Sequence, residues 1–423
     1  MRDIPAEPAN EPAPPSLADE LLIDVEDGAI PERPRHPLLI AAALVLIALN
    51  LRPALSSLGT VLAEVVRDTG VSASSASILT TVPVVCLGVF GLAAPALARR
   101  FGSERVILAM LAALAAGIAL RAVPTFAAQV AAALVVGAGI GVVGALLPGL
   151  VKRDFPERAA LMTGVYTMAL CGGAALAAGT TVPLSHALGG WPLALAFWAL
   201  PALVAVAVWF TGLPDAGAHR AHGRWEVRGL WRDPLAWQVT LFMGLQSSLA
   251  YVVFAWLAPI LRDRGLDPVT AGFVVSSSIL VQLTTALTAP IVAGRSRHQG
   301  GVVLVVVALT LAGLLGCLYA PIGSVWLWAV LVGLGQGGSF ALALTLIVLR
   351  AGDPHVAAAL SSMAQSVGYT LASFGPLLVG LLHDRTGGWG LSGVLFAVVM
   401  AGAAVFGVLA GRPLHVRVVS RPV

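Results

Sequence analysis

Long apolar runs follow one another along this chain, separated by short breaks that are charged or rich in Gly and Pro. A hydrocarbon core of about 30 Å requires roughly 20 apolar residues per helix. The pattern therefore predicts an all-α membrane protein with twelve transmembrane helices. Their expected cores are 38–63, 73–98, 105–122, 126–151, 157–185, 191–212, 234–261, 269–293, 301–320, 324–349, 355–382 and 389–411.

The longest break, about 213–233, divides these helices into two sets of six. We expect five regions along the chain. The five regions are a cytoplasmic tail (1–36), a six-helix bundle (37–212), a cytoplasmic linker (213–233), a second six-helix bundle (234–411) and a cytoplasmic tail (412–423). The first tail is acidic, rich in proline and without an apolar core, which is typical of a disordered segment.

The two sets of helices resemble each other at an offset close to 196 residues. Three short stretches recur in the same order, each with a partner in the second set: "PALARR" (95–100) with "PIVAGR" (290–295), "GAGIGVVG" (137–144) with "GLGQGG" (333–338), and "HALGGW" (186–191) with "DRTGGW" (384–389). Two parallel six-helix repeats with a binding site between them are the architecture of major facilitator transporters.

Both glycine stretches also match G-x-G-x-x-G, but the dinucleotide motif requires a preceding strand and a βαβ unit, which this pattern does not offer. Glycine faces that allow membrane helices to approach closely explain them better.

The charges indicate an orientation. If the N-terminus is cytoplasmic, nineteen of the 25 basic residues lie in interior segments. Five lie in exterior loops, namely Arg67, Arg121, Arg262, Arg264 and Arg385. The remaining one is Arg52. This asymmetry agrees with the positive-inside rule and places both termini in the cytoplasm. We expect a multi-pass protein of the bacterial inner (plasma) membrane.

Composition supports the membrane assignment and narrows the chemistry. The chain is 58% hydrophobic and 11% charged, whereas about 25% charge is usual in soluble proteins. Its three cysteines are dispersed within apolar runs, so we expect them to pack as small apolar residues. The patterns G-x-x-x-x-G-K, H-E-x-x-H and G-x-S-x-G are absent. We therefore expect a non-enzymatic protein that does not hydrolyse ATP, with no cofactor, metal or nucleic-acid partner.

Arg52 is the main candidate for function. It lies about 14 residues into the first apolar run, roughly 20 Å deep at 1.5 Å per residue. A charge at the bilayer centre costs at least about 2.5–3.5 kcal/mol, so it needs a partner. All 21 acidic residues lie in the tail, in loops or at helix ends, the closest being Glu64. We expect Arg52 to be the one buried ionisable side chain apart from tyrosine and cysteine.

Two interpretations of Arg52 stay open. A substrate anion could neutralise it, or it could cap backbone carbonyls that Pro53 leaves unpaired, beside Asn50. The same shortage of carboxylates bears on coupling: a proton symporter would have to use Glu64, Asp68 or the substrate itself, and a uniporter or exchanger is equally open.

Polar side chains in the bilayer usually face a cavity, and here they concentrate in the first, second, fifth, seventh, eighth and eleventh segments. The third, sixth, ninth and twelfth carry almost none and should be peripheral. The expected substrate-binding residues are Arg52 for charge, Trp256 as an aromatic wall, and, as hydrogen-bonding groups, Asn50, Tyr166, Gln246, Tyr251, Gln365 and Tyr369.

Three stretches carry a resemblance to a known family. They are "NLRPALSSLGTVL" in the first segment, "LLPGLVKRDFPERAALMTGVYT" (146–167) and "GLQSSLAYVVFAWLAPIL" (244–261). The chain resembles the cyanate permease branch of the major facilitator superfamily, which also contains nitroimidazole exporters. The resemblance covers roughly 38–411. It implies twelve helices, alternating access and a small polar or anionic substrate, with Arg52 in the family's Asn-Leu-Arg-Pro motif.

The loop after the second segment departs from the wider superfamily. The usual motif there is Gly-x-x-x-Asp-Arg-x-Gly, whereas "PALARRFG" has Pro95 at the glycine and Arg99 at the aspartate. A cytoplasmic gate and a simple topological signal are equally open for the basic residues in the two copies of this loop. The gating candidates are Arg99, Arg100, Arg105 and Arg295.

We therefore expect a monomeric secondary or facilitative transporter of a small, anionic or polar, cyanate-like substrate, in contact with membrane lipid. The alternative is efflux of a small drug-like compound, such as a nitroimidazole, through the same fold. A membrane enzyme or sensor is a third possibility, which would need clustered titratable groups at one membrane depth.

Overall fold

The computed structural model describes residues 37–155, 159–211, 225–352 and 354–422. The expected tail 1–36 and most of the linker lie outside these residues. Twelve helical segments within them are long and apolar enough to cross a membrane, which confirms the predicted number. They are 38–60, 74–94, 103–120, 126–147, 164–187, 191–211, 234–263, 268–295, 300–319, 322–350, 356–386 and 390–410.

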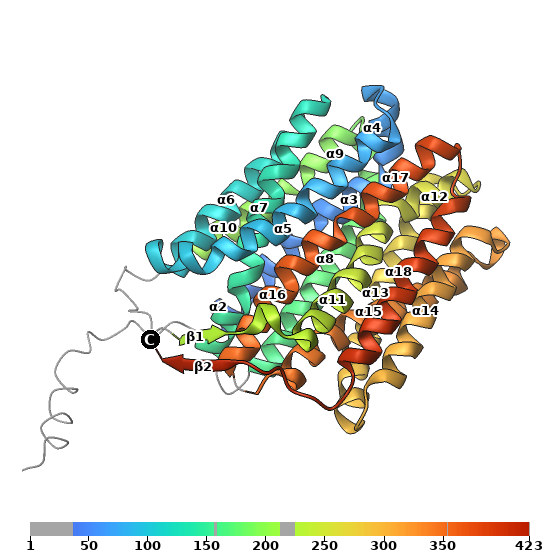
Figure 1. Ribbon diagram of the computed structural model, residues 1–423. Helices are drawn as coiled ribbons and strands as arrows, with labels where there is room; N and C mark the ends of the chain where they lie inside the picture. Colours follow the sequence, from blue (N-terminus) through green and yellow to red (C-terminus); the bar gives the residue numbers. More distant parts are fainter. Residues whose placement is uncertain (1–36, 156–158, 212–224, 353, 423) are drawn as a thin grey trace, which may run out of the picture. The chain divides into compact units, whose positions relative to one another are not determined.

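The helices run side by side, those of the first half coloured blue to green and those of the second yellow-green to red in Figure 1. Several spans are built from two or three consecutive helices. The first half contains α2 (Pro37–Leu51), α3 (Pro53–Thr60), α4 (Leu62–Thr69), α5 (Ala73–Phe101), α6 (Ser103–Leu120), α7 (Phe126–Asp154), α8 (Ala159–Ala187), α9 (Trp191–Phe197) and α10 (Ala199–Thr211).

The second half begins with a span that changes its winding midway, where one π-helical turn interrupts the α-helix. It contains α11 (Pro234–Val252), the π-helical turn η3 (Val253–Leu257), α12 (Ala258–Asp263), α13 (Pro268–Arg295), α14 (Gly300–Tyr319), α15 (Val325–Arg350), α16 (Pro354–Ala372), α17 (Phe374–Thr386) and α18 (Gly390–Ala410). Short 3₁₀ turns, η2 (Leu230–Arg232) and η4 (Ile322–Ser324), precede α11 and α15.

Local sequence explains where the helices begin. Asp233 and Asp267 each accept a hydrogen bond from a backbone N–H three residues later, and each is followed by a proline at the first helical position. A capping side chain satisfies an otherwise unpaired N–H, and proline has no N–H to satisfy there. Ser72 caps α5 in the same way. Helix α4 ends at Gly70, whose φ of 68° suits a residue without a side chain.

The recurring glycine stretches bring helices together at matching positions in the two halves. A methyl group on Gly137 would lie 2.6 Å from the Cα of Pro83, so α7 packs directly on the backbone of α5. The equivalent Gly333 packs α15 against α13, where a methyl group would overlap the carbonyl oxygen of Ser278. Helix packing rather than nucleotide binding accounts for both stretches.

The last helix of each half presents an apolar stripe on its outer surface. On α18 the exposed residues are Leu391, Val394, Val398 and Val405, spaced three or four apart except for the last. Such a stripe is expected where a helix meets lipid. By contrast, 78% of the apolar window in the 234–263 span is buried, which places this span among the other helices.

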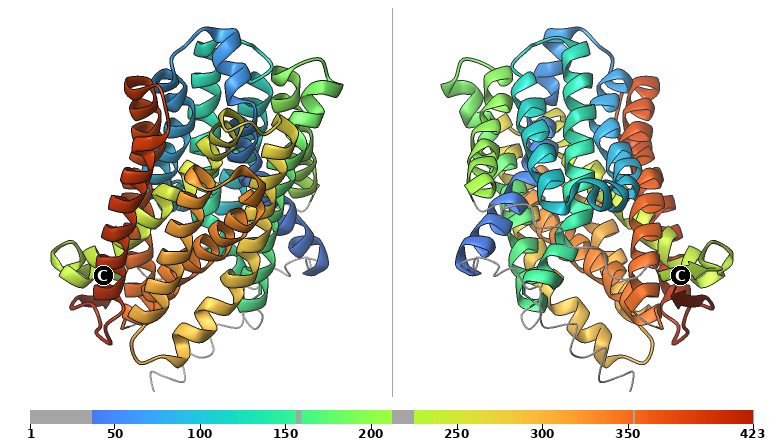
Figure 2. Two further views of the ribbon diagram at one scale, coloured as in Figure 1. Left: turned by 90° about the vertical axis from the view of Figure 1, so that its right-hand side faces the viewer. Right: turned by 90° about the vertical axis from the view of Figure 1, so that its left-hand side faces the viewer.

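The chain between the halves is tied to the C-terminal tail. Strand β1 (Trp225–Arg228) pairs antiparallel with β2 (Val419–Pro422), next to the C-terminus in Figure 2. The Asp233 carboxylate accepts a 2.9 Å hydrogen bond from the backbone N–H of Arg417. Parts of the predicted linker and tail therefore form one small structure.

Candidate functional site

The first span is interrupted at Arg52. This residue connects α2 to α3 with φ −106° and ψ −22°, and Pro53 follows at the first position of α3. Proline lacks the N–H that would bond to the carbonyl of Leu49 in a continuous helix. The break thus sets the guanidinium at a joint between two short helices.

The Arg52 guanidinium lies between two aromatic rings of the second half. Its central carbon is 5.9 Å from the ring centre of Phe254 on η3 and 5.7 Å from that of Phe340 on α15. A cation over an aromatic face within about 6 Å is attracted by the ring quadrupole. Among the described residues, no carboxylate or backbone carbonyl pairs with this guanidinium. The capping role considered for Arg52 is therefore absent from this part of the chain.

Three tyrosines from three helices gather near Arg52. The rings of Tyr251 and Tyr369 meet edge to face, with centres 6.1 Å apart and planes at 81°. Both lie within electrostatic range of Arg52, and Tyr166 lies within range of Tyr369. The structure thus brings together Arg52 and all three tyrosines that the sequence singled out.

A narrow pocket lies between the halves, beside this group. Its empty volume is about 260 Å³, including the space at its mouth. Residues of α3 and α5 form one wall, and residues of α11 and η3 form the other. The lining is mostly apolar, with Thr80 and Tyr251 as its polar residues, and comprises Ala54, Leu55, Leu58, Leu79, Thr80, Pro83, Val84, Tyr251, Phe254 and Ala255.

Two other expected binding residues, Asn50 and Gln246, form hydrogen bonds within their own half. The Asn50 amide donates to the carbonyls of Leu46 (2.7 Å) and Pro201 (3.1 Å), within the first half. The buried Gln246 amide donates to the Ser247 hydroxyl at 2.7 Å. Both amides thus donate within their own half in this structure, and their role in binding substrate stays a prediction.

Trp256 is likewise committed within the second half. Its indole N–H donates to the carbonyl of Pro376 at 2.9 Å, and its ring packs against Trp389. The aromatic wall beside Arg52 comes instead from Phe254 and Phe340, which the sequence analysis did not select. Gln365 lies one turn before Tyr369 on α16 and bonds the Ser361 hydroxyl at 2.8 Å.

The gating candidates lie at the surface where the structure describes them. Arg100, Arg105 and Arg295 are exposed, and the Arg100 guanidinium lies over the ring of Phe101. The side chain of Arg99 is outside the described part of the chain. The role of these residues stays a prediction.

The expectation that Arg52 would be the one buried ionisable group was wrong. Arg121, which we assigned to an exterior loop, is 2% exposed and donates to the carbonyl of Ala54 at 2.9 Å. Arg350 is 3% exposed, donating to Gln299 and to the carbonyl of Leu414. Each arginine reaches from the end of its helix back into its own half, which a linear count of charges does not reveal.

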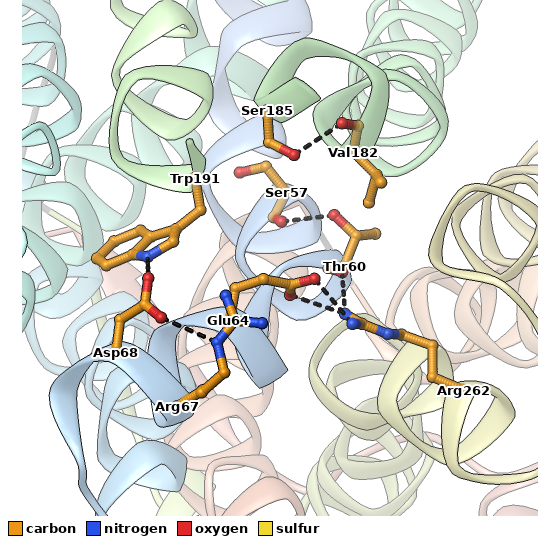
Figure 3. Close-up of polar contacts among 9 residues, drawn as sticks. All are labelled: Ser57, Thr60, Glu64, Arg67, Asp68, Val182, Ser185, Trp191 and Arg262. Atoms are coloured by element: carbon orange, nitrogen blue, oxygen red, sulfur yellow. Dashed lines mark hydrogen bonds and ion pairs between the residues drawn. The ribbon is translucent and has the colours of Figure 1, made fainter. Parts of the chain in front are cut away.

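A second polar group lies at the end of the helices opposite the C-terminal tail, which we call the distal end. There Arg262 on α12 donates to both carboxylate oxygens of Glu64 on α4, at 2.7 and 2.8 Å (Figure 3). This ion pair joins the two halves. From the sequence, Glu64 was only the acidic residue closest to Arg52, and Arg262 was expected in an exterior loop.

Within each half, a tryptophan–aspartate hydrogen bond ties two helices together at the distal end. The indole of Trp191 donates to Asp68 at 2.9 Å, and the indole of Trp389 donates to Asp263 at 2.9 Å. Both tryptophans end the repeated "GGW" stretches. In each case the start of the sixth span is tied to the helix that ends the first part of that half, α4 in the first half and α12 in the second.

Comparisons with known proteins agree with this architecture. A family model described as Major Facilitator Superfamily matches residues 38–373. Two relatives come from Escherichia coli (strain K12). A 2-nitroimidazole transporter is 36% identical over 391 residues, covering 90% of this chain and 98% of that protein. The cyanate transport protein CynX is 32% identical over 367 residues, covering 86% and 94%.

The fold also matches solved structures. A bacterial homolog of the human lysosomal transporter Spinster gives a TM-score of 0.72 at 15% identity, covering 90% of this chain and 97% of the other. At that identity the likeness concerns the fold alone.

Proposed function

Because the chain belongs to the Major Facilitator Superfamily, we propose that it carries a small anion or small polar nitrogen compound, cyanate-like, across the bacterial inner membrane. The substrate binds in the pocket beside Arg52, and the two six-helix halves rock around it in alternating access. Both chain termini face the cytoplasm, and the distal end faces outward.

The observation that carries this proposal is the position of Arg52. Its charge lies at the joint of α2 and α3 and interacts with the rings of Phe254 and Phe340 across the halves. Aromatic faces stabilise a cation only partly, by about 0.5–2 kcal/mol. An anion bound in the pocket supplies the missing charge and gains charge-assisted hydrogen bonds from the guanidinium.

The narrowness and the lining of the pocket support a small substrate. In this state of the protein the pocket is narrow and closely lined by side chains from both halves. Tyr251 and Thr80 are the polar residues of its opposite walls, and the Thr80 hydroxyl, which donates to the carbonyl of Ser77, can still accept a hydrogen bond. Tyr369, next to Tyr251, and Tyr166 complete the polar side of the proposed site, with Gln365 one turn away on α16.

A second candidate is efflux of a small aromatic compound such as a nitroimidazole. The apolar lining and the rings of Phe254, Tyr251 and Phe340 favour a flat ligand that stacks against them. The relative named 2-nitroimidazole transporter supports this alternative.

Transport by the purified protein in proteoliposomes tests both candidates. Labelled cyanate and labelled 2-nitroimidazole are offered separately, and the entry rate of each is measured against empty vesicles. We expect protein-dependent movement of cyanate. Arg52→Ala should weaken cyanate binding about 10- to 100-fold, since hydrogen bonds to charged groups contribute about 1.5–3 kcal/mol.

Two control variants make the result specific. Arg52→Lys keeps the charge but loses the planar fork, so we expect an intermediate loss. Arg67→Gln removes an exposed guanidinium of the same half and should transport normally. Unchanged cyanate transport in a well-folded Arg52→Ala protein would rule out the role of Arg52. Movement of nitroimidazole without cyanate would replace the first candidate by the second.

A further inference from the structure

We propose that Glu64 and Arg262 form a latch that holds the two halves together at the distal end, so that breaking this ion pair is required for the pocket to open on that side. The inference rests on the alternating access proposed above. It assigns the closing contact to two named side chains.

The geometry of the pair is that of a strong interaction. Two guanidinium nitrogens of Arg262 donate to the two carboxylate oxygens of Glu64, at 2.7 and 2.8 Å, and one of them also donates to the carbonyl of Thr60 at 3.3 Å. The side chains are only 18% and 21% exposed. Partial burial reduces screening by solvent, and the parallel fork fixes the relative position of the helices.

The same region contains an ion pair with the opposite properties. Arg67 and Asp68 are adjacent on α4, 3.0 Å apart, with side chains 74% and 43% exposed. Exposed pairs of this kind contribute little. Because both members belong to the first half, this pair cannot hold the halves together, and it provides a matched control.

Each latch residue is fixed to its own half. Asp68, one turn beyond Glu64, accepts the indole N–H of Trp191. Asp263, directly after Arg262, accepts that of Trp389. Because each helix end is tied to the sixth span of its own half, the halves cannot separate here by bending one end away. Opening must therefore pull Glu64 from Arg262.

Further contacts between the halves lie toward the same end. The Asp384 carboxylate accepts the backbone N–H of Ser74 at 2.7 Å. In the first span, Gly59 packs so closely on η3 that a methyl group would overlap the carbonyl oxygen of Phe254. These contacts help the Glu64–Arg262 ion pair to close the distal end.

The latch and the pocket share the same two chain segments. One segment runs from Arg52 through α3 to Glu64, and the other runs from Phe254 through η3 and α12 to Arg262. A ligand that changes the distance between Arg52 and Phe254 therefore acts on the segments that carry the latch. The π-helical turn lies between these two points, and such turns often occur at functional sites.

Cysteine accessibility tests the latch without any substrate. Ser57 lies on α3, before Glu64 in the chain, and its side chain is 1% exposed. Its hydroxyl has no hydrogen-bond partner in the described structure, so Ser57→Cys is a mild change. The purified protein in lipid nanodiscs is treated with a polar thiol reagent, and the labelling rate is measured. The parent protein, with its three buried cysteines, gives the background.

We expect Glu64→Gln and Arg262→Gln, each added to Ser57→Cys, to raise the labelling rate about tenfold, because removing one partner of a partly buried pair leaves the other uncompensated. Arg67→Gln should leave the rate unchanged. The exchange Glu64→Arg with Arg262→Glu should restore slow labelling.

Unchanged labelling in both glutamine variants would overturn the latch. If either glutamine variant does not fold, Arg262→Lys, which keeps the charge without the fork, should still give a severalfold rise, and a parental rate would count against the proposal. A wrong substrate assignment leaves this experiment unaffected, so the two proposals fail separately.

Discussion

Two adjacent glycines on α8 provide a matched test of how the break at Arg52 is packed. Gly173 faces the backbone of α2, where a methyl group would overlap the carbonyl oxygen of Leu49 and lie 2.9 Å from its carbonyl carbon. That carbonyl is the one left without a helical partner by Pro53. Gly172 has no atom within 4 Å of the same position. The two variants to compare are Gly172→Ala and Gly173→Ala.

The expected effects have opposite signs. Alanine is more favourable than glycine in a helix by about 0.5–1 kcal/mol, so Gly172→Ala should stabilise by roughly this amount. Gly173→Ala gains the same term, but the methyl group must push α8 away from α2. Overpacking of this kind costs about 1–3 kcal/mol or more, since the obstacle is backbone rather than a movable side chain. Because the helix term is common to both, the two variants should differ by the overpacking cost alone, about 1–3 kcal/mol.

The protein carries its own reporter for this measurement. Cys86, Cys171 and Cys317 are buried and unpaired, so a thiol-reactive fluorophore reports their exposure as the protein is heated. For a folded unit the size of one half, a change of 1 kcal/mol in the free energy of unfolding shifts the Tm by about 2–4 °C. We expect the midpoint of thermal unfolding to rise by a few degrees for Gly172→Ala and to fall for Gly173→Ala. Equal midpoints for the two variants would refute the close approach of α8 to α2.

Two further predictions concern the chain ends and the distal end. Asp233→Ala removes both the cap of α11 and the acceptor for Arg417, so it should cost about 0.5–2 kcal/mol and speed proteolysis of the C-terminal tail; an unchanged cleavage rate would contradict the anchoring. The hydrogen bond from Trp191 lowers the pKa of Asp68, which lies beyond the membrane span. A carboxyl with a lowered pKa adds stability that is present above its unfolded pKa of about 3.9 and is lost as the pH falls through the folded value. The difference in midpoint between the wild type and Asp68→Asn should therefore be constant from pH 8 to pH 5 and shrink only below about pH 4; a loss between pH 8 and pH 6 would contradict this assignment.

The fold was predictable because the bilayer imposes strong rules. Twelve apolar runs, a repeat near 196 residues and glycine faces are all properties of linear sequence, and the structure confirms the twelve helices and the packing role of the glycines. Breaks within a span were less visible. Pro53 indicated the joint at Arg52, whereas nothing in "YVVFAWLAP" distinguishes a π-helical turn from an ordinary helix.

The candidate site was predictable only in part. Arg52 and the three tyrosines were found because polar side chains are conspicuous among apolar ones. Their apolar neighbours Phe254 and Phe340 were not. Asn50 is two residues from Arg52, yet it turns toward Pro201, because neighbouring positions on a helix point in different directions. The pairing of Glu64 with Arg262 joins residues 198 apart in sequence, so it appears only when both halves are assembled.

The short strand pair at the chain's end has a practical consequence for anyone who labels this carrier. A fluorescent protein or affinity tag fused after the last residue would extend β2, which is hydrogen-bonded to the connector between the halves. Pulling on such a tag, or trimming the final residues to remove it, would disturb that connector directly. Reporters for this protein are better inserted elsewhere, such as the η4 turn at Gly323, where an added methyl group would have no atom within 4 Å.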